Sequence, residues 1–303
     1  MKASPSPAPR RIPGKLEGRL WVLAAALLWS TGGLFAKAPI FDDCPLAIRG
    51  PMFAFWRAFF AALVLLPMVR RPRFRGLIVP LVLIFTAMNV TYLASLTRTT
   101  AANAIWLQAT APWWVFLFSV FLFRQPIVRR DLIPLVFGCL GVGAILAFEI
   151  QGQARFGVLA GLASGIGYAM VLVLLHQLGS ENSAWLIAIC HAVAAVAMFP
   201  WVVYLGWWPS LGQLVVLAGF GAVQMGIPYT FMTYGMRSVS SQEAVAIALV
   251  EPILMPLWVF LFYHEAPAWW TVLGAALILT GLVLRYVVWE LLVVKAGIVP
   301  SDS

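Results

Sequence analysis

The segment ALVEPILMPL, residues 248–257, places one glutamate and two prolines inside an otherwise apolar run. A charged side chain at the centre of a membrane-spanning helix costs about 2.5 to 3.5 kcal/mol on insertion scales, and each proline removes a backbone hydrogen bond. Glu251, Pro252 and Pro256 are therefore unusual if this run crosses a membrane. The rest of the sequence indicates that this run crosses a membrane and suggests a function for the interruption.

The composition is typical of a protein embedded in a bilayer. Hydrophobic residues make up 62% of the 303 residues, charged residues make up 10%, and the mean hydropathy is +0.93. So few polar side chains cannot cover a soluble globule. Runs of about 20 apolar residues are long enough to cross the hydrocarbon core. We expect an all-α integral membrane protein with ten spans, at residues 20–38, 51–69, 77–96, 100–123, 131–149, 156–175, 183–205, 212–235, 241–263 and 268–289.

The links between these spans are short and leave no room for a soluble domain. Residues 1–19 are rich in proline and arginine and lack the pattern of a cleaved signal peptide, so we expect a disordered cytoplasmic tail there. Residues 290–303 form a second expected tail. The chain is therefore predicted to act within its helix bundle.

Cysteine, histidine and charge patterns exclude several classes of function. The three cysteines and three histidines are scattered, without the spacing of a metal site or a catalytic group. We therefore expect no enzyme, no metal and no cofactor. The net charge of +9 comes largely from basic loops such as residues 70–76 and 124–130, which does not resemble a nucleic-acid-binding face. The positive-inside rule instead predicts that both termini are cytoplasmic.

The two halves of the chain repeat one another. A shift of 140 residues aligns 99–149 with 239–289 without a gap. Each repeat, 20–149 and 156–289, would hold five spans, so the second must enter the membrane from the opposite side. The loops 206–212 and 264–271 lack the arginines of their equivalents, as that inversion requires. The identical pairs are Ala104 with Ala244, Pro112 with Pro252, Leu117 with Leu257, and Gly141 with Gly281.

Glu251 and Pro252 lie in the middle of span 241–263, and Pro112 lies at the same depth in span 100–123. Paired interruptions of this kind mark the binding site of transporters with inverted repeats. Other spans carry polar or aromatic residues near that depth, which suit a small organic solute better than a bare ion. The candidate substrate-binding residues are Trp29, Ser30, Asn89, Tyr92, Trp106, Gln108, Tyr168, Gln224, Tyr229 and Glu251.

Simpler explanations compete with these roles. Any one aromatic residue is as readily a packing residue, and Glu251 is nearly as readily a structural hydrogen-bonding group. Arg57 in span 51–69 is expected to extend to the outer headgroups, in preference to pairing with Glu251 or a substrate carboxylate. Lys37 is expected to do the same. Glu243 follows Ser240 by three residues, which predicts a capping box. Pro112, Pro252 and Arg57 are assigned gating or structural roles.

Glycines of spans 20–38 and 156–175, the first span of each repeat, are expected to pack at the two-fold axis between the repeats. They are Gly32, Gly33, Gly161, Gly165 and Gly167.

Four segments resemble the EamA-type repeats of the drug/metabolite transporter superfamily: LLWSTGGLFAK (27–37), WRAFFAALVLLP (56–67), SLTRTTAANAIWLQATAPWWVFLFSVFLFRQ (95–125) and GMRSVSSQEAVAIALVEPILMPLWVFLFYHE (235–265). The resemblance covers residues 20–289 and implies ten helices in two inverted halves. The "EP" and "HE" of the second repeat follow the family pattern, whereas the first repeat has "AP" and "RQ".

Within that superfamily the chain looks most like aromatic or broad-range amino acid exporters of bacterial inner membranes. The resemblance implies that Trp29 lines a central cavity and that Ala111, beside Pro112, leaves room there. It implies a secondary transporter that exports amino acids, aromatic and other neutral ones, and related metabolites by alternating access, as a monomer or homodimer in the lipid bilayer. Export of another metabolite or drug is the alternative, followed by a small-solute channel.

Overall fold

A computed structural model describes residues 13–69, 72–122, 124, 132–150, 152, 154–179 and 181–289. Within these ranges every regular element is a helix, and ten segments are long and apolar enough to cross a membrane. The expected all-α fold with ten spans is confirmed. Residues 1–12 of the expected N-terminal tail, and the whole of the expected tail 290–303, lie outside the described residues.

Several spans consist of two consecutive helical segments. In the first half, the spans are α1 (Lys15–Ser30) with α2 (Gly32–Ala36), α3 (Leu46–Leu65), α4 (Ile78–Arg98), α5 (Ala101–Gln108) with α6 (Ala111–Phe121), and α7 (Leu132–Glu149). In the second half, they are α8 (Arg155–Gln177), α9 (Ser183–Leu205), α10 (Leu211–Gly221) with η4 (Ala222–Gly226) and α11 (Ile227–Gly235), α12 (Ser241–Ala248) with α13 (Val250–Tyr263), and α14 (Trp269–Val283) with η5 (Leu284–Val288). Short 3-10 turns, η1 (Pro39–Phe41) and η2 (Leu66–Met68), flank α3.

The first span begins at Lys15, five residues before the apolar run from which its start was predicted. Its polar first turns are held by Glu243, whose carboxylate accepts a hydrogen bond from Arg19 and forms an ion pair with Lys15 at 3.8 Å. Hydropathy alone does not predict this start, because Lys15 and Arg19 lower the hydropathy of the first turns. Their pairing with Glu243 of the ninth span lets the helix begin there.

Two helices that are equivalent in the repeat begin with the same cap. The Thr100 hydroxyl accepts a hydrogen bond from the Asn103 backbone N–H at 3.1 Å, and the Ser240 hydroxyl accepts one from Glu243 at 3.3 Å. Each bond satisfies one of the free N–H groups of a helix start. The expected capping box at Ser240 is thus only half formed, because the Glu243 side chain pairs with Arg19.

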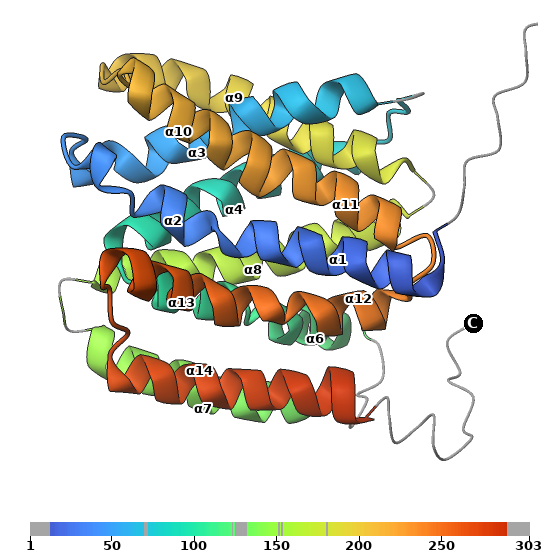
Figure 1. The fold of residues 1–303 in the computed structure, drawn as a ribbon. Coiled ribbons are helices and arrows are strands. Elements are labelled where there is room, and N and C mark those ends of the chain that lie inside the picture. The colour runs from blue at the N-terminus through green and yellow to red at the C-terminus, as the bar shows by residue number, and fades with distance from the viewer. Residues whose placement is uncertain are drawn as a thin grey trace, which may run out of the picture.

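The described chain ends on the side of the bundle where α1 begins (Figure 1). We call that side the Lys15 face and the opposite side the Lys37 face. Five spans bring the chain from the first face to the second, so α8 enters from the Lys37 face and the second half runs inverted relative to the first. Figure 1 shows α7 and α14 as a pair along one edge of the bundle.

Packing between the halves follows the repeat. The second spans pack together as α3 with α9, and the fifth spans as α7 with α14. The first span of each half instead packs on the third and fourth spans of the other: α8 lies against α4, α5 and α6, and α1 lies against α11, α12 and α13. Each contact has its symmetry-related copy, as an internal two-fold relation requires.

Glycines of the first and sixth spans take part in these contacts between the two halves. A Cβ atom on Gly33 would lie 2.5 Å from Val259 of α13, and one on Gly165 would lie 2.7 Å from Thr110, beside α6. Together the five glycines let each first span approach the third and fourth spans of the other half closely. Their packing at the two-fold axis stays a prediction.

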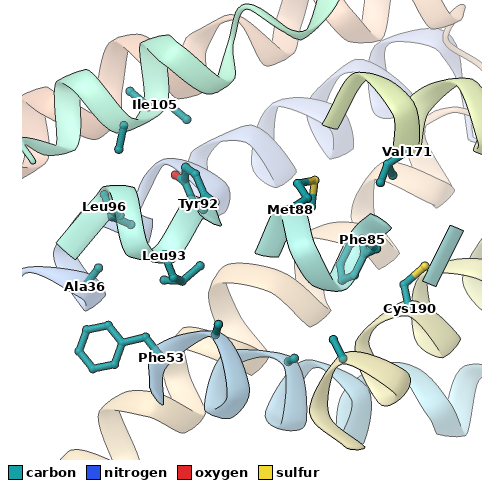
Figure 2. Packing of buried hydrophobic residues seen from close by; sticks show 14 of the residues in the cluster. Ala36, Phe53, Phe85, Met88, Tyr92, Leu93, Leu96, Ile105, Val171 and Cys190 are labelled. Atoms are coloured by element: carbon teal, nitrogen blue, oxygen red, sulfur yellow. The ribbon is translucent and has the colours of Figure 1, made fainter. Parts of the chain in front are cut away.

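The helix α4 is covered on opposite sides by apolar side chains. Figure 2 shows Tyr92 and Leu93 projecting from it in different directions, with Ile105 of α5 on one side and Phe53 of α3 on the other. Leu93 and Phe53 have no exposed surface and Tyr92 is 4% exposed. This burial fixes the helix that carries Asn89 and Tyr92.

A prediction follows from the contact between α7 and α14. A Cβ on Gly141 would lie 2.6 Å from the Gly274 carbonyl oxygen, whereas a Cβ on Gly143, on the same helix, meets nothing within 4 Å. We expect Gly141→Ala to lower the thermal unfolding midpoint of the detergent-purified protein, because separating two backbones typically costs about 1–3 kcal/mol. Gly143→Ala should leave the midpoint unchanged or raise it, since alanine favours the helix. Equal midpoints for the two variants would contradict this packing.

Candidate functional site

The fourth and ninth spans break at equivalent positions. Between α5 and α6 the backbone at Thr110 has a ψ of -6°, and between α12 and α13 Leu249 has a ψ of -12°. Pro112 and Pro252 each fall in the first turn of the helix that follows. Backbone N–H groups of a first turn have no acceptor within the helix, so proline costs little there. These prolines begin half-helices and do not interrupt a continuous one.

Glu251 lies in the first turn of α13, and this position accounts for its presence at mid-span. The partial positive charge and free N–H groups of a helix start favour a carboxylate. The side chain is half-buried and lies within electrostatic range of Arg57, Tyr92 and Tyr168. One break in the ninth span thus explains Glu251 and Pro252 of the segment 248–257, whereas Pro256 lies inside α13.

Arg57 of α3 is 1% exposed, so the expectation that it extends to the headgroups is wrong. Its Nη2 donates a hydrogen bond to Asn89 Oδ1, and Asn89 Nδ2 donates one to the Ala54 carbonyl at 2.9 Å. Its guanidinium carbon lies 5.4 Å from the ring centres of both Tyr92 and Phe220. A neutral amide and two aromatic rings hold the cation inside the bundle.

Tyr92 connects the two halves beside Arg57. Its hydroxyl donates to the sulfur of Met255 at 3.7 Å, a weak bond that joins α4 to α13. The two predicted residues of α4, Asn89 and Tyr92, therefore meet α3 on one side and the broken ninth span on the other.

Trp29 and Ser30, at the end of α1, contact the eighth and ninth spans. The ring of Trp29 lies edge-on to Tyr229 at 5.3 Å, and its carbonyl accepts a bond from Gln224 Nε2 at 3.1 Å. Ser30 is fully buried and accepts a bond from Trp258 Nε1 at 3.0 Å. Four of the predicted residues are thereby brought together across the two repeats.

Gln224 lies in η4, a π-helical turn in the middle of the eighth span. Pro228, four residues later, lacks the N–H that would bond to the Gln224 carbonyl in an α-helix. A π turn is a common adjustment to such a loss and occurs often at functional sites. The side chain is 2% exposed, and its Oε1 has no hydrogen-bond partner among the described residues.

His191 of α9 is a member of this region that sequence analysis did not select. It has no exposed surface, and neither ring nitrogen has a partner in the described parts of the chain. The centre of its ring lies 4.9 Å from the ring centre of Phe85 and 6.1 Å from the ring centre of Tyr229. The sequence did carry a signal for His191, namely its position in the middle of span 183–205, because an ionisable group is seldom tolerated there. A search for clusters of histidines overlooks a single residue of this kind.

The remaining predicted residues, Trp106, Gln108 and Tyr168, differ from these residues in burial or in position. Trp106 is 5% exposed and belongs to the apolar core, and Gln108 is the last residue of α5, next to the break. Tyr168 of α8 is 38% exposed although it lies within electrostatic range of Glu251 and Tyr229. We use the name central cluster for Trp29, Arg57, Asn89, Tyr92, Tyr168, His191, Gln224, Tyr229 and Glu251.

Ion pairs join the first and ninth spans at both faces. Lys37, expected to reach the headgroups, pairs with Glu265 at 2.8 Å and donates to the Thr99 carbonyl at 2.6 Å. Glu265 also accepts the Ala101 backbone N–H at 2.7 Å, which ties in the start of α5. On the Lys15 face the pair of Arg19 and Glu243 takes the same position.

A recess of about 310 Å³ lies at the Lys37 face, lined in part by Lys37, Thr99, Glu149 and Glu265. Glu149 accepts hydrogen bonds from Asn103 at 3.0 Å and from Trp270 at 3.1 Å. The recess therefore lies among the ends of the first, third, fifth and ninth spans and the starts of the second, fourth and sixth.

The comparisons with known proteins agree with this architecture. A protein of known crystal structure, 18% identical, superposes with a TM-score of 0.61 over 90% of this chain and 98% of its own, which is a likeness of fold. An uncharacterized transporter of Archaeoglobus fulgidus is 29% identical over 277 residues, covering 89% of this chain and 96% of the relative. The family model for EamA-like transporters matches twice, at residues 16–147 and 155–287. The two matches together cover most of the sequence, and the chain belongs to the EamA-like transporter family.

Proposed function

We propose that this transporter is a secondary exporter of amino acids, aromatic and other neutral ones, and related metabolites, and that the central cluster binds them. The observation that carries the proposal is the convergence of aromatic and polar side chains from both halves beside two equivalent helix breaks. Transporters with inverted repeats bind substrate at such breaks, near the bilayer midplane.

The chemistry of the central cluster supports an organic solute with an apolar body and charged ends. Trp29 and Tyr229 offer ring surface, while Arg57 and Glu251 supply one charge of each sign. In the described residues no group of three or more His, Cys, Asp or Glu side chains could hold a metal ion. The accessible surface of Tyr168 and Glu251, inside spans, is what side chains lining a solvent-filled cavity would have.

Alternating access would open and close the two faces in turn. The ion pairs of Lys37 with Glu265 and of Arg19 with Glu243 close the first span against the ninth at each face. The basic loops on the Lys15 face support a cytoplasmic position for that face and for both termini, in a bacterial inner membrane. The recess at the Lys37 face would then open outward, toward the side where an exported solute leaves.

The first test is uptake of a radiolabelled amino acid panel by liposomes that contain the purified protein. We expect saturable, protein-dependent uptake, and we expect Trp29→Ala to raise the KM about tenfold through loss of aromatic contact. Trp208→Ala removes a tryptophan that is 55% exposed and should leave the KM unchanged. An absence of uptake for every amino acid would refute the proposed substrates.

A second test concerns energy coupling. Glu251 is the only carboxylate in the middle of a span among the described residues, so a proton-exchange cycle would depend on it. If a pH gradient stimulates the wild-type transporter, we expect Glu251→Gln to lose that stimulation and to transport amino acids down a substrate gradient with a raised KM, because the carboxylate is part of the central cluster. Glu181→Gln, which removes an acid paired with Arg75 on the Lys15 face, is the control. Retained stimulation in Glu251→Gln would exclude proton exchange through this residue.

A further inference from the structure

Three side chains of the central cluster keep polar atoms that are buried and lack hydrogen-bond partners within the described residues. These atoms are Nε and Nη1 of Arg57, both ring nitrogens of His191, and Oε1 of Gln224. Arg57 and His191 have at most 1% exposed surface, and Gln224 has 2%. Native proteins leave few buried polar groups unpaired, so several in one place indicate a partner that binds there.

The unpaired atoms lie in one neighbourhood. Arg57 lies within electrostatic range of His191, and α3 packs directly on η4, which carries Gln224. The ring centre of His191 in turn lies 6.1 Å from the ring centre of Tyr229, and the Tyr229 ring contacts that of Trp29. A solute against Trp29 and Tyr229 would thus have unpaired nitrogen donors beside it.

Arg57 is the dominant charge among these groups. In the described ranges no carboxylate lies within ion-pair distance of it, and its one side-chain hydrogen bond goes to the neutral Asn89. An unpaired buried cation is strongly unfavourable, in proteins and in membranes alike. Asn89, Tyr92 and Phe220 nevertheless hold the guanidinium in place, so the site retains a cation with free N–H donors.

We infer that the substrates of this transporter carry a carboxylate and that Arg57 is the residue that binds it. This inference rests on the proposed transport function and specifies its substrate class. His191, which lies within electrostatic range of Arg57, would contribute a second donor to the carboxylate, and Asn89 acts as a positioning residue. Glu251, at the start of α13, then supplies the opposite charge for solutes that also carry an ammonium group.

A purely structural role for Arg57 makes a different prediction. If the guanidinium only joins α3 to α4 through Asn89, its replacement will change stability and leave the preference for an acid over an uncharged analogue unaltered. The test therefore measures that preference and not transport alone.

The experiment is competition of L-phenylalanine uptake into liposomes by unlabelled L-phenylalanine and by L-phenylalaninamide, which lacks the carboxylate. In the wild type we expect the acid to compete at least about tenfold more strongly than the amide, as expected for a lost hydrogen bond to a charged group. In Arg57→Gln the ratio should fall toward one. Arg237→Gln removes a cation that is exposed at the Lys15 face and should keep the wild-type ratio. Equal competition by acid and amide in the wild type, or an unchanged ratio in Arg57→Gln, would overturn the inference.

A binding measurement separates this inference from the proposed function. If no amino acid is transported, the thermal midpoint of the detergent-purified protein is measured with 3-phenylpropionate and with 3-phenylpropionamide, because a ligand stabilises the state that it binds. Stabilisation by the acid alone, lost in Arg57→Gln, would support a carboxylate site even though amino acid export had failed. Equal effects of acid and amide, or none, would reject it. If Arg57→Gln does not fold, Arg57→Lys takes its place: the ammonium lacks the planar array of donors, so a reduced acid preference supports the inference and an unchanged one rejects it.

Discussion

The backbone of a membrane-spanning chain must satisfy its own hydrogen bonds, because the hydrocarbon core offers no water to do so. This constraint makes every span helical and permits irregular backbone only where protein covers it. The breaks at Thr110 and Leu249 meet it by lying against the first span of the opposite half, where close packing is possible because glycines replace larger side chains. The same breaks provide helix starts inside the bilayer, and Glu251 occupies one of them. The position of a charge at mid-depth thus follows from the way in which the backbone is satisfied.

Span number, span type and the inverted repeat could be predicted from the sequence, because hydropathy, loop charge and a shift of 140 residues all depend on local composition. The paired breaks also had a local signal in Pro112 and Pro252. Arg57 was predicted wrongly because its environment is not local: Asn89 and Phe220 come from other spans, and nothing near Arg57 in the sequence indicates that they surround it. His191 was overlooked for a related reason, since a lone histidine acquires meaning only once Tyr229 and Arg57 are known to lie near it.

The central cluster combines residues with two kinds of environment. Arg57, Asn89 and Gln224 are fixed by burial and by bonds to neighbouring spans, whereas Tyr168 and Glu251 keep accessible surface. A rigid polar framework beside accessible aromatic and acidic groups is suited to selecting a solute by charge while tolerating variation in its apolar part. Selection by charge and tolerance of shape are the combination that the proposed export of several amino acids requires.

The packing of each first span on the opposite repeat bears on how such a chain can assemble. α1 finds its partners, α11, α12 and α13, only after the second repeat has been inserted, and α8 likewise depends on α4, α5 and α6. Neither five-span unit is therefore a closed folding unit, although each is a complete unit of sequence. A single repeat made alone could recover these contacts only by pairing with a second copy inserted in the opposite orientation. Fusion of the two copies in one polypeptide fixes their ratio at one to one, and the loss of arginines from the loops of the second copy is what its opposite orientation requires.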